Sequence, residues 1–152
     1  MIKSILVPTD GSDWSLRAAR YAVSLMRLGD NVEVTVFTVD NIPRRLAKRN
    51  FFWIAAERGN PDDSDRVEDP YAESRARILT RTKAVFDEAG LPVRTNHGRG
   101  SPAGEIVRYA SEQKTDLIVM GHRGAGALQE LLMGSVSHKV VQLATCPVII
   151  VK

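Results

Sequence analysis

Residues 117–135 read LIVMGHRGAGALQELLMGS. The apolar run Leu117–Met120 is typical of a strand that is buried on both faces, and a glycine-rich loop follows it directly. Gly134 and Ser135 then open a helix that we expect to end near residue 145. A buried strand that leads through a loop into a helix is the repeating unit of a parallel α/β sheet. The segment therefore predicts an α/β fold.

The rest of the chain alternates in the same way. Four further strands are predicted at 2–7, 32–39, 91–96 and 147–151, and three further helices at 12–29, 71–89 and 101–114. Ser12 is expected to cap the first helix and Gly29 to end it. This order predicts a three-layer α/β/α sandwich with a five-stranded parallel sheet, Rossmann-like in form. Ligands of such sheets bind beyond the carboxyl ends of the strands, which directs attention to loops 8–12, 40–70 and 121–135.

Length and charge exclude several classes of protein. The chain has 152 residues, with 21 Lys and Arg against 18 Asp and Glu, and a net charge of +3. This length fits one domain, 1–152, with a variable insertion at about 41–70. The charge is too small to indicate nucleic-acid binding, and apolar runs of at most six residues are far short of the ~20 that span a membrane. We therefore expect a cytoplasmic protein that binds neither nucleic acid nor membranes.

The loop 121–135 has the composition of an anion-binding loop. Glycines let the backbone approach a phosphate, because no Cβ atom stands in the way, and successive N–H groups can surround an anion. Gly134 and Ser135 add the N-terminal N–H groups of a helix and a hydroxyl donor. The spacing of the glycines is equally consistent with a tight loop of purely structural purpose. It is neither a Walker A sequence nor the dinucleotide fingerprint, which follows the first strand of its fold.

Taken together, several motifs resemble the universal stress protein family over nearly the whole chain. They are Val7–Ser12, Gly98 with Pro102, Ala103 and Ile106, the run 117–124, the run 134–137, and Cys146–Val151. The nucleotide signature of that family is Gly, two residues, Gly, nine residues, Gly, then Ser or Thr. Gly121, Gly124, Gly134 and Ser135 match this spacing. The resemblance implies strand order 3-2-1-4-5. It also implies an ATP-binding protein of the stress response, in which Mg²⁺ either accompanies the ATP or is absent.

The resemblance also implies which residues hold the nucleotide. Asp10, with Pro8 in the same turn, would face the ribose or an associated metal ion, and the backbone of Val39 would meet the adenine edge. The ribose and phosphates would be held by Gly121, Gly124, Gly134, Ser135 and Val136. Arg123 lies within the glycine loop and is expected to approach a phosphate. A cap on the first helix is the alternative role for Asp10, and core packing is the alternative for Val39.

Charge divides the insertion into two halves. Residues 41–59 carry five basic groups and one acidic group, whereas 60–70 carry five acidic groups and one basic group. Phe51, Phe52 and Trp53 lie in the basic half. One interpretation is a self-paired flap anchored by these aromatic residues. The other is a lid over the nucleotide, with Arg44, Arg45 and Lys48 reaching the phosphates.

Two classes of function compete on these residues. The first is a regulatory protein that signals through its nucleotide-bound state, with slow ATP hydrolysis or autophosphorylation as the alternative; no base for fast hydrolysis and no catalytic residue is predicted. The second is a phospho-acceptor receiver domain, which needs a Lys before the Pro of the last strand, where this chain has Cys146.

The histidines share no metal-ligand spacing, so no metal site is predicted. Pro147–Val151 would be an edge strand, and the resemblance implies a homodimer through it.

Overall fold

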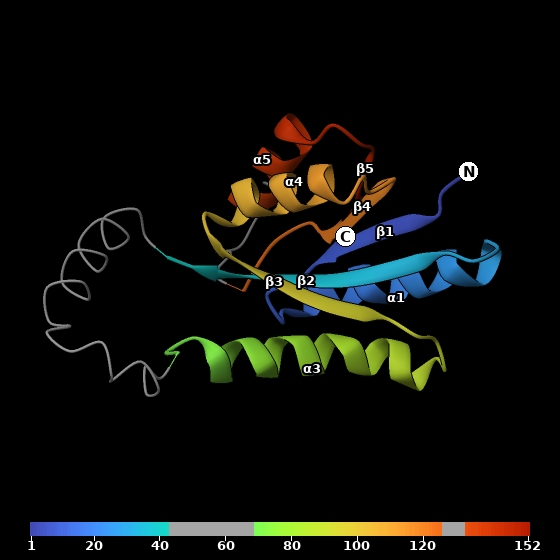
Figure 1. The fold of residues 1–152 in the computed structure, drawn as a ribbon, viewed down its shortest axis with the longest axis horizontal. Helices are drawn as coiled ribbons and strands as arrows, with labels where there is room; N and C mark the ends of the chain where they lie inside the picture. Colours follow the sequence, from blue (N-terminus) through green and yellow to red (C-terminus); the bar gives the residue numbers. More distant parts are fainter. Residues whose placement is uncertain (43–68, 126–132) are drawn as a thin grey trace, which may run out of the picture.

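The computed structural model describes residues 1–42, 69–125 and 133–152 as five strands and four helices. In chain order they are β1 (Ser4–Pro8), α1 (Asp13–Leu28), β2 (Glu33–Asn41), α3 (Ala72–Glu88), β3 (Arg94–Gly100), α4 (Pro102–Glu112), β4 (Leu117–Gly121), α5 (Ser135–Leu143) and β5 (Val148–Val151). The strands form one parallel sheet in the order β3-β2-β1-β4-β5 (Figure 1). The predicted fold class and strand order are confirmed.

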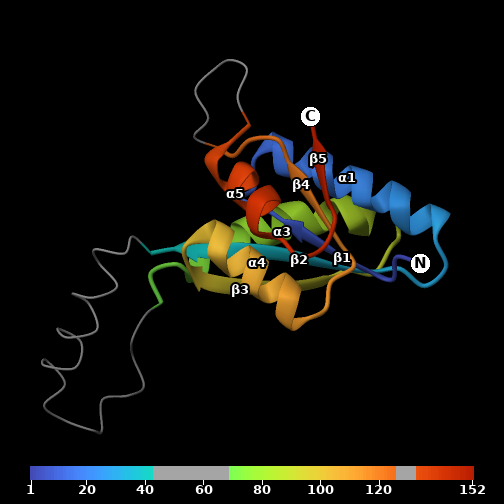
Figure 2. The same cartoon turned by 90° about the horizontal axis from the view of Figure 1, so that it is seen from above.

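Helices cover both faces of the sheet (Figures 1 and 2). Residues of α1 and α3 pack on one face, where Val7, Val36 and Val119 meet Phe86 of α3 in a buried cluster. Residues of α4 and α5 pack on the other face, around Leu6 and Ile118. Successive residues of the central strands therefore enter two different cores. This explains why the sequence of β4 is continuously apolar instead of alternating.

The two ends of α1 follow the predicted capping pattern. The Ser12 hydroxyl accepts a hydrogen bond from the backbone N–H of Ser15 at 3.3 Å, and the N–H of Gly29 reaches the carbonyl of Leu25 at 3.1 Å. Ser101 also occupies the N-cap position of α4, but its side chain makes no capping hydrogen bond. The helix expected to reach residue 145 ends at Leu143.

The position of the third strand was predicted wrongly. The expected range was 91–96, whereas β3 runs from Arg94 to Gly100, so that Pro92 precedes the strand. Its limits are set by pairing with β2, which continues in register from Thr35 with Arg94 to Asn41 with Gly100. The sequence of β3, RTNHGRG, has no apolar alternation, because this edge strand is exposed at most of its positions.

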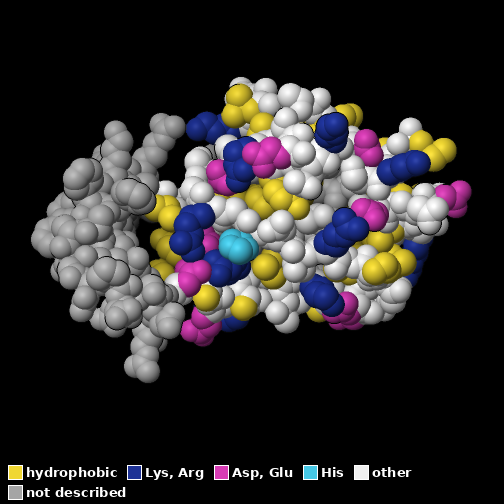
Figure 3. Space-filling view, in the orientation of Figure 1, with side chains coloured by type: hydrophobic (Ala, Val, Ile, Leu, Met, Phe, Trp, Pro, Cys, Tyr) yellow, Lys and Arg dark blue, Asp and Glu magenta, His cyan; other side chains and the backbone are white. Residues whose placement is uncertain are grey.

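Two further expectations concern the surface. Within the described residues, none of the helices has the length and apolar composition needed to cross a membrane. On the face shown in Figure 3, acidic side chains lie among the basic ones. The absence of nucleic-acid binding stays a prediction.

Both interpretations of the insertion concern residues 43–68, including the aromatic run and the three basic residues named above, and these lie outside the described residues.

Candidate functional site

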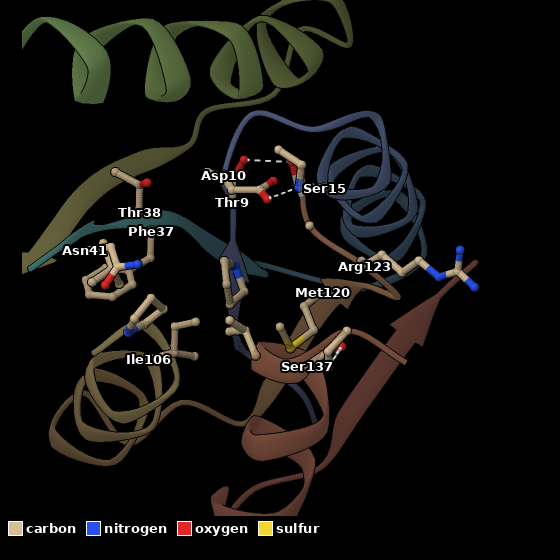
Figure 4. A pocket seen from close by; sticks show the side chains of 18 of the residues that line it. Thr9, Asp10, Ser15, Phe37, Thr38, Asn41, Ile106, Met120, Arg123 and Ser137 are labelled. Carbon is tan, nitrogen blue, oxygen red and sulfur yellow. Dashed lines mark hydrogen bonds between the residues drawn. The ribbon is translucent and has the colours of Figure 1, made fainter. Parts of the chain in front are cut away.

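A cavity of about 490 Å³ lies at the carboxyl ends of β1, β2 and β4 (Figure 4). The strand order reverses at this place, because the chain runs outward from β1 to β2 and β3 on one side and to β4 and β5 on the other. All residues predicted for the site line this cavity, namely Pro8, Asp10, Val39, Gly121, Arg123, Gly124, Gly134, Ser135 and Val136. The sheet therefore brings together segments that are more than a hundred residues apart in the chain.

Asp10 joins the two loops that border the reversal point. One carboxylate oxygen accepts the N–H of Ser12 at 2.9 Å, and the other accepts the N–H of Ala125 at 2.8 Å. The N-cap of α1 is Ser12, so the alternative role of Asp10 as the cap of that helix is not the one observed. Asp10 instead closes a turn before the helix and fixes the start of the glycine loop after β4.

Each described glycine of the signature permits a close approach. A Cβ atom at Gly121 would lie 2.7 Å from the backbone carbonyl carbon and oxygen of Trp14, and one at Gly124 would lie 2.7 Å from a carboxylate oxygen of Asp10. A Cβ atom at Gly134 would lie 3.2 Å from the Cα of Arg123. The glycines therefore have a structural purpose: Gly121 lets β4 approach α1, Gly124 lets the two loops approach each other, and Gly134 lets the start of α5 approach the end of β4.

The N-terminus of α5 forms another part of the cavity wall. Its N-cap is Gly134, which has no side chain to accept the first N–H groups, and Ser135 and Val136 line the cavity. The N–H of Gly134 donates to the carbonyl of His122 at 2.9 Å, and the buried Ser137 hydroxyl lies 3.0 Å from the same carbonyl. These bonds hold the start of the helix against the end of β4. The uncapped N–H groups and the helix dipole favour an anion at this position.

The opposite side of the cavity, formed by residues of β2 and α4, is largely apolar, and of its residues sequence reasoning identified only Val39. Phe37, Thr38, Asn41 and Ile106 lie together on one side of the view in Figure 4, apart from Thr9, Asp10 and Ser15. Phe37 is buried and stacks on the ring of Tyr109 with a centroid distance of 4.4 Å. Met120 closes the predicted strand 117–120 at its carboxyl end, and this position was the signal that could have found it, whereas Phe37 lies within the strand predicted at 32–39.

Two side chains near the glycine loop do not point into the cavity as anion ligands. Figure 4 shows the guanidinium of Arg123 directed away from the other labelled residues. The ring of His122 packs edge-on against Trp14, with the ring centroids 6.0 Å apart. The predicted approach of the Arg123 side chain to a phosphate therefore requires a different rotamer, whereas Arg123 is already among the residues that line the wall.

Cys146 packs beside the α4 and α5 core, and burial raises the pKa of its thiol, which agrees with a packing role.

A network of charges lies between β2, β3 and the start of α3. The Asp40 carboxylate, whose side chain is 4% exposed, pairs with Arg75, and Arg75 also binds Asp69 at 2.8 Å. Arg99, whose side chain is 48% exposed, lies 2.9 Å from Asp69 and 3.4 Å from Asp40. The hydrogen bond from Arg75 lowers the pKa of Asp69. The network fixes the ends of the two strands and the first turns of α3 beside the cavity.

Comparison with known proteins identifies the family. The model of the universal stress protein family matches residues 1–152. The chain belongs to this family. It is similar to universal stress protein MJ0531 of Methanocaldococcus jannaschii, with 35% identity over all of this chain and 83% of that protein. It is also similar to universal stress protein YxiE of Bacillus subtilis, with 33% identity over the full length of both. The predicted family membership is confirmed.

Solved structures of similar proteins have the same fold. The structure of protein MJ0577 has a TM-score of 0.75 and 27% identity, over all of this chain and 96% of that one. A universal stress protein in complex with cAMP has a TM-score of 0.69 and 23% identity, over 99% of this chain and 97% of that one. A universal stress protein from Archaeoglobus fulgidus in complex with dAMP has a TM-score of 0.64 and 21% identity, over 100% of this chain and 98% of that one. At 23% and 21% identity, the likeness to the cAMP and dAMP complexes concerns the fold alone.

Proposed function

We propose that this universal stress protein binds ATP in the cavity at the strand reversal and acts in the stress response through its nucleotide-bound state. The observation that carries the proposal is the division of the cavity into two chemically different sides. One side offers backbone N–H groups of the glycine loop and of α5, and the other offers Phe37 and Ile106 (Figure 4). A volume of about 490 Å³ falls within the ~300–1,000 Å³ of small-molecule sites. The complexes of family members with cAMP and dAMP support the same ligand class.

The two sides of the cavity assign a part of ATP to each group of residues. The N–H groups near Gly121, Gly124 and the first turn of α5 would receive the phosphates, and the backbone at Val39, with Thr38 beside it, would meet the adenine edge. Asp10 would face the ribose. Among the described residues no group of three His, Cys, Asp or Glu could hold a metal ion by itself. A Mg²⁺ ion would therefore arrive with the phosphates, with Asp10 as the carboxylate of the cavity wall.

Binding without fast hydrolysis is the form of the proposal that the site favours. A hydrolytic site needs a base that positions water against the terminal phosphate. Asp10 is the carboxylate among the described residues that line the cavity, and both of its oxygens already accept backbone N–H groups. Both oxygens are therefore engaged with the backbone instead of being directed at a water molecule. Slow hydrolysis or autophosphorylation is the alternative, and turnover of bound ATP over hours distinguishes the two.

Identification of the bound nucleotide is the direct test. Freshly purified protein is denatured, and any released nucleotide is identified by mass spectrometry. Calorimetric titration with ATP then gives the affinity, which we expect to be of micromolar order, about −8 kcal/mol. Asp10→Ala is expected to weaken binding at least tenfold, about 1.4 kcal/mol, whereas Asp30→Ala, an equal loss of charge at the far end of α1, leaves it unchanged. No released nucleotide and no heat with millimolar ATP would refute the proposal.

We include a homodimer and a cytoplasmic location in the same proposal. Among the described residues β5 pairs with β4 on one side only, so Val148–Val151 presents its other edge. An apolar edge strand with free N–H and carbonyl groups favours pairing with another strand. A second copy of the chain that pairs antiparallel at this edge would satisfy these groups.

A further inference from the structure

Two adjacent residues of α3 hold the loop that carries Asp10. Arg81 donates from Nη1 to the carbonyl of Gly11 at 2.7 Å and from Nη2 to the carboxylate of Asp13 at 3.0 Å. The hydroxyl of Thr82 lies 2.7 Å from the hydroxyl of Thr9. One helix turn therefore contacts the residues on both sides of Asp10.

Thr82 belongs to a buried chain of hydroxyl groups. Thr82 is 0% exposed, and Thr9 and Ser15 are also buried. The Thr9 hydroxyl lies 3.0 Å from that of Ser15 and accepts the N–H of Gly11 at 3.1 Å, while the Ser15 hydroxyl donates to the carbonyl of Ser12 at 2.8 Å. The Thr82 hydroxyl also lies 3.0 Å from the carbonyl of Ile78, so each of the three hydroxyls has at least two polar partners. A buried and fully satisfied network of this kind holds one conformation of the backbone around it.

The conformation held in this way is one that glycine adopts readily and other residues rarely adopt. Gly11 has a φ of +77°, in the left-handed region that favours glycine. Its N–H is bound by Thr9 and its carbonyl by Arg81, so both polar groups of this residue are restrained. The preceding residue is Asp10, whose carboxylate reaches Ala125 at 2.8 Å. The restraint on Gly11 therefore sets the direction of Asp10 and, through it, the start of the glycine loop.

We propose that Thr82 and Arg81 are positioning residues for nucleotide binding, which act by holding Asp10 in its bridging position between the two loops. The inference rests on the proposed function. Neither side chain lines the cavity, so both act through loop 9–13.

Thr82→Val is the informative substitution, because valine has the shape of threonine without the hydroxyl. A methyl group in place of the hydroxyl would stand 2.7 Å from the Thr9 oxygen, whereas carbon and oxygen approach to about 3.3 Å at the closest. Thr9 must therefore move, and Gly11 with it. Thr82→Ser keeps the hydroxyl and removes only the methyl group. Arg81→Met removes the guanidinium at a half-exposed site, so it leaves the core intact.

Two measurements test the proposal at a temperature where every variant is folded. Calorimetry gives the affinity for ATP, and the amide resonances of Gly11 and Ala125 report the loop geometry without ligand. The matched controls are Thr80→Val and Arg77→Met, which are exposed residues of the same helix. We expect Thr82→Val and Arg81→Met each to weaken ATP binding about fivefold and to shift both resonances. Thr82→Ser and the controls stay within about twofold of the unmodified protein.

The outcomes separate this inference from the proposed function. Unchanged affinity in Thr82→Val and Arg81→Met would overturn it, as would an equal loss in Thr82→Ser, which would indicate packing instead of the hydroxyl. If the unmodified protein binds no ATP, the proposed function fails. The loop positioning is then decided by the resonance of Ala125: a shift in Thr82→Val that is absent from Thr82→Ser supports it, and no shift overturns it.

Discussion

Gly124→Ala tests the link between the two loops by adding a single methyl group. The new Cβ would lie 2.7 Å from the Asp10 oxygen that accepts the N–H of Ala125. A carbon–oxygen contact of about 3.3 Å is needed, so the carboxylate must retreat by about 0.6 Å. Its 2.8 Å hydrogen bond to Ala125 would then exceed the ~3.2 Å limit of a good N–H···O bond. The substitution should therefore break the bridge between the loops.

The expected magnitude follows from the bond that is lost. A hydrogen bond to a charged group contributes about 1.5–3 kcal/mol. Asp10 is exposed, so a value at or just below the low end applies, about 1.4 kcal/mol, which is about tenfold in ATP affinity. The backbone at Gly124 has no positive φ, so alanine brings no conformational strain of its own. The loss is therefore a consequence of the contact with Asp10.

Calorimetric titration with ATP, together with thermal unfolding, is the assay. Gly104→Ala is the matched control, because its Cβ would meet only Ser101, at 3.9 Å, in the interior of α4. We expect that control to bind as the unmodified protein does. In an Asp10→Ala background the clash is gone, so Gly124→Ala should cost much less there. Gly124→Ala with unchanged affinity, or with the same cost in both backgrounds, would refute the reasoning.

Three further predictions follow from described contacts. Gly121→Ala should lower the free energy of unfolding by about 2 kcal/mol in urea titrations, because its Cβ meets the rigid backbone of Trp14 at 2.7 Å. The N–H groups of Lys3 and Ser4 lower the pKa of Asp116, so its contribution to stability is present above the ordinary aspartate pKa and is lost as the pH falls through the lower folded value. Urea midpoints between about pH 5 and pH 3 should fall less steeply for Asp116→Asn than for the unmodified protein. Sedimentation at tens of micromolar should give a dimer; a monomer would contradict pairing through Val148–Val151.

The charge network beside the cavity has a consequence for the insertion. Asp40 lies just before the insertion and Asp69 lies at its end, and Arg75 binds both. The start and the end of the insertion are thereby fixed to each other. The lid and flap interpretations both begin from these fixed ends, and both stay predictions.

The sequence by itself determined the fold and the glycine-loop side of the cavity. The buried run 117–120 predicted β4, Ser12 and Gly29 predicted the ends of α1, and Gly121 with Gly124 predicted the loop beside the cavity. These features are local: burial on both faces makes a strand continuously apolar, and a cap or a close approach restricts the residue type at one position. Such restrictions are legible in the chain without knowledge of its neighbours.

Tertiary structure alone decided what lies across the cavity and what holds its loops. The limits of β3 depend on its register with β2, and its polar sequence carries no sign of them. The contact of Thr82 with Thr9 joins residues 73 positions apart, and threonine on a helix face is equally consistent with simple packing. The direction of the Arg123 side chain depends on its rotamer, which the sequence does not specify. Hydrogen bonds between distant segments depend on register and on side-chain direction, and both are set only when the layers pack.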